Sequence, residues 1–81
     1  MKVRDHGSIV TAGAVKIEEG CRPSRIVLRT VDGYEPWTTH LETLKIDPKS
    51  NMLVHESFQW GHYFEKREHA EVDFKARVKE L

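Results

Sequence analysis

The residues of this chain best suited to chemistry are two histidines and a glutamate: His40, Glu42 and His55. Imidazole nitrogens and a carboxylate are ligands that zinc accepts, and the same groups can act as general bases. The histidines lack a His-x-x-x-His or His-x-His spacing, so the three side chains meet only if their strands pair in one register. A metal-assisted enzyme is therefore one hypothesis. The alternative, which we favour, is that the histidines have a structural role and form hydrogen bonds on a partly solvent-exposed face of the sheet.

Basic residues offer a second hypothesis. Arg25, Arg29 and Lys45 could serve a nucleic-acid-binding accessory factor by contacting phosphates. The chain has thirteen basic and thirteen acidic residues, however, and nucleic-acid-binding domains usually carry a basic excess. A solvated charged face is the better interpretation of these arginines. Cys21 lies beside Arg22 in a polar turn, and the sequence shows no accompanying pattern of a general base and an orienting group that would indicate a catalytic nucleophile.

The size of the chain limits its organisation. Its 81 residues, 38% of them hydrophobic, can fill one core, so we expect a single domain over 1–81 with a loose start at 1–7. One cysteine allows no internal disulfide. The opening residues lack the apolar core of a signal peptide, and no apolar run approaches the roughly 20 residues that span a bilayer. We therefore expect a reduced, cytoplasmic protein that does not enter membranes.

Hydrophobic alternation and turn residues predict four strands, at 8–18, 25–31, 37–46 and 52–64. Asp32-Gly33 indicates a tight hairpin turn, after which pairing restarts at Trp37 because Pro36 cannot donate to a ladder. Asp47 and Pro48 are typical of the start of a type I turn over 47–51. The last strand is long enough to bend at Gly61.

Residues 66–80 are predicted to form the only helix, with Ala70, Phe74 and Val78 on one stripe. The fold class is then α+β, an antiparallel four-stranded meander with one C-terminal helix packed on one face. We expect the helix to cover an aromatic stripe of the last strand, with Phe74 against Trp60 or Phe58. Strict alternation gives that stripe the following members: Met52, Val54, Phe58, Trp60 and Phe64.

The uncovered face of the last strand would carry Leu53, His55, Ser57, Gln59 and Tyr63. Two registers with strand 37–46 are open. If Ile46 opposes Asn51, Glu42 faces His55. If Ile46 opposes Met52, Glu42 meets Glu56, a like-charge pair that costs energy, although the apolar residues then align better.

Three short blocks resemble small uncharacterised proteins encoded by tailed bacteriophages and prophages. They are Thr39-His40-Leu41-Glu42, Trp60-Gly61-His62-Tyr63-Phe64 and Asp73-Phe74-Lys75-Ala76-Arg77, within residues 39–77. The resemblance implies a compact cytoplasmic accessory protein and transfers no catalytic residue.

The function that we expect is therefore a non-enzymatic accessory module that binds a protein partner or itself, as a homodimer. A meander has two sheet edges, and a bare second face offers a surface to bury. Near-zero net charge also favours self-association. We expect no cofactor and no bound metal. The candidate binding residues are Trp37, His40, Glu42, His55 and Tyr63.

Overall fold

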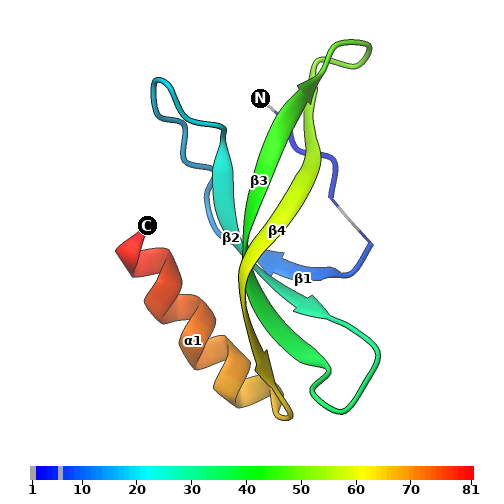
Figure 1. The fold of residues 1–81 in the computed structure, drawn as a ribbon, viewed down its shortest axis with the longest axis vertical. Coiled ribbons are helices and arrows are strands. Elements are labelled where there is room, and N and C mark those ends of the chain that lie inside the picture. Colours follow the sequence, from blue (N-terminus) through cyan, green and yellow to red (C-terminus); the bar gives the residue numbers. More distant parts are fainter. Residues whose placement is uncertain (1, 6) are drawn as a thin grey trace.

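The computed structural model describes residues 2–5 and 7–81. Within them the elements are β1 (Ile9–Ala12), β2 (Ser24–Thr30), β3 (Trp37–Asp47), β4 (Met52–Phe64) and α1 (Arg67–Glu80). The four strands form one antiparallel sheet in the order β1-β2-β3-β4, and α1 lies along one side of it (Figure 1). The predicted α+β meander with a C-terminal helix on one face is confirmed. Strand β1 is shorter than the predicted strand 8–18.

The core lies at the centre of β2 and β3. Consecutive residues of β2 are buried, so both faces of the sheet are covered there. A fully buried valine, leucine or isoleucine side chain contributes about 1.5–3 kcal/mol relative to an exposed one. The apolar residues of this core are Ile26, Val27, Leu28, Leu41, Leu44, Leu53 and Ala70.

The β2–β3 connection is longer than the predicted two-residue turn. Thr30 pairs with Trp37, and the residues between them form the loop, in which Gly33 takes a positive φ of 127°. Pairing does restart at Trp37, as expected. The turn is wider because Val31 N–H donates to the Pro36 carbonyl, so the loop closes beyond the Asp32-Gly33 pair.

Both predicted registers of β3 with β4 are wrong. Asp47 pairs with Met52 and Ile46 with Leu53, so the strands continue one residue further into the turn than expected. The side chain of Asp47 accepts hydrogen bonds from the Ser50 hydroxyl and from Lys49 N–H. Both bonds lower the pKa of Asp47, and the bond from Ser50 has the larger effect. Asn51 closes the loop at φ +59°, a conformation that asparagine tolerates better than most residues.

Two irregularities in the β3–β4 ladder then change which β4 residues share a face. Thr43 pairs with Ser57 and Leu44 with His55, so Glu56 is an extra residue. Further along, Trp60 and Gly61 lie opposite the single residue His40, near the bend expected at Gly61. An extra residue in one strand interrupts the alternation of its side chains. The faces predicted by strict alternation are therefore wrong for Ser57, Phe58 and Gln59, between the two irregularities, and hold again for Tyr63 and Phe64.

Helix α1 lies on the predicted side of the sheet, but the aromatic stripe expected there is incomplete, because Phe58 faces the other side and Trp60 is exposed. Its Asp73 accepts a hydrogen bond from Thr39 Oγ1, and its Arg77 donates to the Thr39 carbonyl and Oγ1, at 3.3 and 3.0 Å. The helix thus packs on the Thr39 face of β3. Phe58 pairs with Glu42, whose side chain points to the opposite face. The expected packing of Phe74 on Phe58 is wrong because the first irregularity moves Phe58 to that other face.

The segment before β1 is attached to the sheet, where a loose start was expected. Leu53 N–H donates to the Lys2 carbonyl, and Arg4 N–H donates to the Leu53 carbonyl. Asp5 forms an ion pair of 2.9 Å with the buried Arg25. This segment therefore runs beside the start of β4 and partly covers its outer edge.

Candidate functional site

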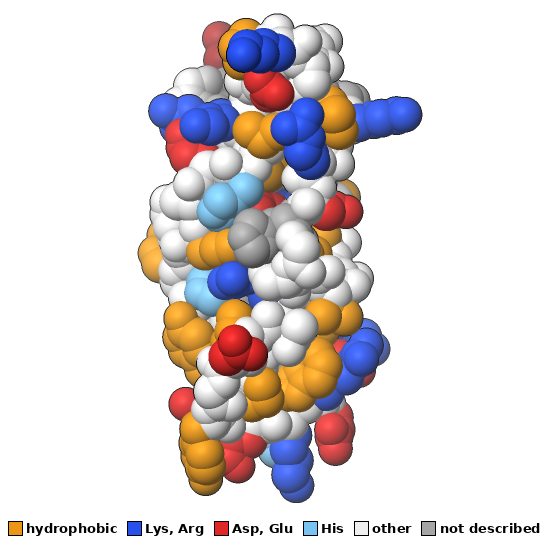
Figure 2. Space-filling view, turned by 90° about the vertical axis from the view of Figure 1, so that its right-hand side faces the viewer, with side chains coloured by type: hydrophobic (Ala, Val, Ile, Leu, Met, Phe, Trp, Pro, Cys, Tyr) orange, Lys and Arg blue, Asp and Glu red, His pale blue; other side chains and the backbone are white. Residues whose placement is uncertain are grey.

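Four of the five predicted binding residues share the face that turns away from α1. His40 and Glu42 are buried on β3, whereas His55 is half-buried and Tyr63 is 53% exposed on β4. Figure 2 shows this side of the molecule, where histidine side chains lie among hydrophobic ones and charged side chains gather toward both ends. Trp37 lies elsewhere, beside the start of α1, with the Arg67 guanidinium 5.2 Å from its ring.

Glu42 is the centre of a buried ionic network. Its side chain is 1% exposed. One carboxylate oxygen lies 2.7 Å from Arg25 Nε, and the other lies 2.9 Å from His55 Nδ1. Arg25 also reaches Asp5. The contact between Glu42 and His55, which only one of the two registers considered would give, is therefore present, although it forms diagonally across the ladder and in neither of those registers. Both carboxylate oxygens are occupied by donors of the same chain.

His40 is enclosed between β3 and β4. Its Nδ1 lies 3.1 Å from Thr38 Oγ1, and its Nε2 lies 3.4 Å from the Tyr63 hydroxyl. A Cβ on Gly61 would stand 2.5 Å from Nε2, so only glycine leaves room for the imidazole there. Burial, and then the nearby charge of Arg29, lowers the pKa of His40 to about 4. The ring is therefore neutral at physiological pH.

Phe58 joins these groups into one cluster. The Arg29 guanidinium lies 3.7 Å from the centre of its ring, a cation–π contact. The rings of His55 and His40 lie 4.2 and 5.3 Å from it, centre to centre. Among the described residues every buried side-chain nitrogen or oxygen has a hydrogen-bond partner. We term this cluster of Arg25, His40, Glu42, His55 and Phe58 the histidine face.

The histidine face is not arranged as a metal site. Over residues 2–5 and 7–81 no group of three or more histidine, cysteine, aspartate or glutamate side chains is placed to hold a metal ion. Phe58 stands between the two imidazoles, and Arg25 neutralises the Glu42 carboxylate. The geometry thus gives the metal-assisted alternative no support.

The basic residues of the nucleic-acid hypothesis do not form a common exposed strip. Arg25 is 5% exposed and pairs with two carboxylates, and Arg29 covers Phe58 while donating to Ser8. Lys45 is exposed. Two of the three side chains are thus engaged within the fold, which leaves little free positive charge to meet phosphates.

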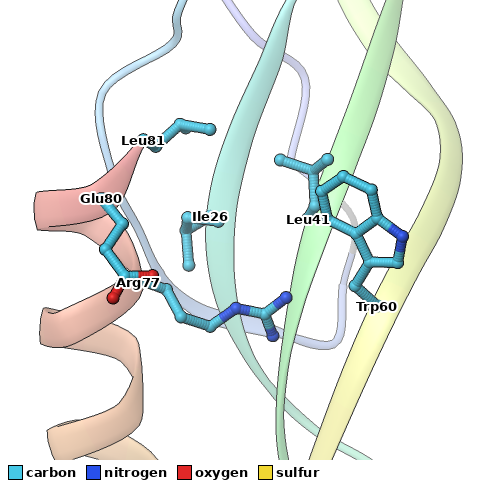
Figure 3. Close-up of a pocket in the computed structure, with 6 residues that line it drawn as sticks. All are labelled: Ile26, Leu41, Trp60, Arg77, Glu80 and Leu81. Atoms are coloured by element: carbon cyan, nitrogen blue, oxygen red, sulfur yellow. The ribbon is translucent and has the colours of Figure 1, made fainter.

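A second surface lies on the helix side of the sheet. The C-terminal half of α1 and the neighbouring strands enclose a hollow of about 240 Å³, which we term the Trp60 groove. Figure 3 shows Ile26 and Leu41 on its floor, Trp60 on the β4 side, and the Arg77 guanidinium reaching across from the helix. Its lining residues are Ile26, Leu41, Trp60, Arg77, Glu80 and Leu81.

Trp60 is held on the rim of this groove in an unusual backbone conformation. Its φ is +53°, in the left-handed region, which costs an L-residue about 1–2 kcal/mol. Its side chain is nevertheless 70% exposed, so packing within the chain does little to offset that cost. Strained residues that the fold retains are concentrated at functional sites. The predicted role of Trp60 as a buried core residue is wrong.

The sequence contained one signal for this residue. A glycine inside a strand pattern often marks a bulge or a close backbone approach. The Trp60-Gly61 step has both features, because the two residues oppose one β3 residue and Gly61 faces the imidazole of His40. Alternation alone had placed Trp60 under the helix.

Comparison of the chain with family models, curated proteins and solved structures gives no match. Among the described residues no helix has both the length and the apolar character needed to cross a membrane. The function must therefore be argued from the two surfaces themselves.

Proposed function

We propose that the chain is a small protein-interaction module that associates with itself and has no catalytic role. The observation that carries the proposal is Trp60, a large aromatic side chain that is 70% exposed at φ +53°. Tryptophan and arginine are enriched among the residues that dominate interface energies. Trp60 and Arg77 lie on opposite sides of the same groove.

The size of the groove favours a side chain of another protein over a small molecule. Pockets for drug-sized ligands usually have about 300–1,000 Å³, and the Trp60 groove has about 240 Å³. Equal numbers of basic and acidic residues also leave two copies without net repulsion. A cytoplasmic accessory role of the bacteriophage type agrees with this proposal but does not carry it.

Sedimentation equilibrium of the untagged chain tests the proposal. We expect a monomer–dimer equilibrium with a dissociation constant in the micromolar range, as is common for small interfaces. A single monomeric species up to several hundred micromolar would contradict self-association. Elemental analysis of the same sample separates the metal-assisted alternative, because one zinc per chain, lost on His55→Ala, would favour it instead.

A further inference from the structure

The Trp60 groove places a projecting side chain and a hollow beside each other on one surface. Trp60 projects from the rim, and the floor beside it is formed by Ile26 and Leu41. In a two-fold dimer the same patch of both copies meets itself, so a patch must contain both the projection and the site that receives it. The Trp60 groove meets this requirement.

Building on the proposed self-association, we infer that two copies interlock by each inserting Trp60 into the Trp60 groove of the other. A tryptophan can bury about 150–250 Å² of surface in such a site. The Arg77 guanidinium, which extends over the floor of the groove, would lie against the partner's indole in a cation–π contact.

The charges of the rim select a second copy as the occupant. Arg77 and Glu80 lie three positions apart on α1 and both line the groove. Arg77 Nη1 is held by Thr39, whereas Nε and Nη2 have no partner among the described residues. Glu80 is exposed and forms no ion pair within that part of the chain. A two-fold axis through the groove brings each Arg77 to the Glu80 of the other copy. The dimer then contains two equivalent ion pairs between Arg77 and Glu80.

The first experiment removes the inserted side chain. Trp60→Ala should raise the dimer dissociation constant at least about 30-fold, the loss expected for a central interface tryptophan. The matched control is Tyr34→Ala, which removes an aromatic side chain that is 84% exposed and outside the groove, and should leave the constant unchanged. If wild type dimerises and Trp60→Ala dimerises equally well, this inference is wrong while the proposed self-association stands. If wild type is monomeric, both are wrong.

The second experiment tests the two-fold pairing of charges. Glu80→Arg alone and Arg77→Glu alone each place like charges against each other in a homodimer, so both should dimerise at least 10-fold more weakly. A mixture of the two variants restores opposite charges at both contacts and should form a heterodimer with near wild-type affinity. Circular dichroism of each variant checks that it is folded. Two variants that stay folded but fail to recover affinity on mixing would overturn the paired arrangement.

The third experiment observes the indole directly. In a Trp37→Phe background Trp60 is the only tryptophan of the chain. Its fluorescence emission should shift to shorter wavelength as the protein concentration passes through the dissociation constant, because the indole leaves water. An emission maximum that stays at the solvent-exposed position in the dimer would contradict the insertion of Trp60.

Discussion

The histidine face and the Trp60 groove lie on opposite sides of the same sheet and differ in how completely their groups are satisfied. On the histidine face, Glu42 has a donor on each oxygen and His40 has a neighbour at each nitrogen. At the groove, Trp60 is exposed on a strained backbone, and Arg77 has donors that no residue in the described part of the chain engages.

This difference distinguishes residues whose types suit catalysis or metal binding from residues whose side chains are exposed to a possible partner. Buried polar groups are stable only when they are hydrogen-bonded, so a buried cluster of histidine, arginine and glutamate tends to satisfy itself. The polar groups of the histidine face are therefore engaged with one another. At the groove the large side chain of Trp60 is exposed, and the proposed self-association is built on that exposure.

The largest expected effect concerns the buried ion pair of the histidine face. Glu42→Ala leaves Arg25 buried without its main partner, and breaking a buried pair in this way costs about 3–5 kcal/mol. Urea denaturation should show this loss in the free energy of unfolding. The control is Glu71→Ala, which breaks the exposed pair with Arg67 and should cost less than about 0.5 kcal/mol. Similar costs for the two variants would show that burial adds nothing to the cost of breaking the Glu42 pair.

The second prediction concerns acid. The pKa of His40 is about 4 in the folded protein and near 6.5 in the unfolded chain, so the unfolded state binds the proton more readily between these values. Stability is therefore full above pH 6.5 and decreases as the pH falls to 4, by about 3 kcal/mol at most. Denaturation midpoints of wild type and His40→Gln across this range measure the effect. A decrease of equal size in both would assign it to other groups.

The third prediction concerns the contact between β4 and the imidazole. A methyl group at Gly61 would meet His40 Nε2 and the Tyr63 hydroxyl, so Gly61→Ala should destabilise the fold by about 1–3 kcal/mol through overpacking. Gly7→Ala is the control, because nothing lies within 4 Å of its added Cβ. Thermal unfolding compares the two. An unchanged midpoint for Gly61→Ala would mean that His40 moves away at little cost.

The smallest predicted effect tests the groove. Trp60→Gly relieves the positive φ at the cost of backbone entropy, and should stabilise the monomer by about 0.5–1 kcal/mol while abolishing dimerisation. Gln59→Gly, a neighbouring exposed position with ordinary φ, should destabilise by a similar amount. Unfolding at low concentration measures both. A loss of more than about 1 kcal/mol in Trp60→Gly would show that the indole stabilises the monomer.

Most of the fold could be predicted from the sequence because local signals determine it. Alternating residues and the turn at Asp47-Pro48 predict the strands, and the helical spacing of Ala70, Phe74 and Val78 predicts α1, although only Ala70 of the helix is buried. One of the two open registers also brings Glu42 to His55, and the contact forms although that register is wrong, because both residues project to the same side of adjacent strands.

The faces of residues 57–59 in the middle of β4 could not be predicted in the same way. Alternation assumes that every residue pairs, and Glu56 and Trp60 depart from that assumption. Glu56 has a partner in Arg22, at 3.0 Å, that only the tertiary structure brings near. Trp60 takes a positive φ at the step where two β4 residues oppose one β3 residue, beside Gly61, which leaves room for the buried His40. Contacts between residues that are distant in the sequence cannot be predicted from the pattern of neighbouring residues.

The attachment of the segment before β1 has a consequence for the order in which the molecule assembles. Strands β3 and β4 are joined by a short loop, so their pairing costs little loop-closure entropy and can form early in folding. The hydrogen bonds of Lys2 and Arg4 with Leu53 join distant parts of the chain and require the hairpin to exist first. This segment should therefore dock last in folding, and the amide of Arg4 should exchange with deuterium faster than those at the centre of β3.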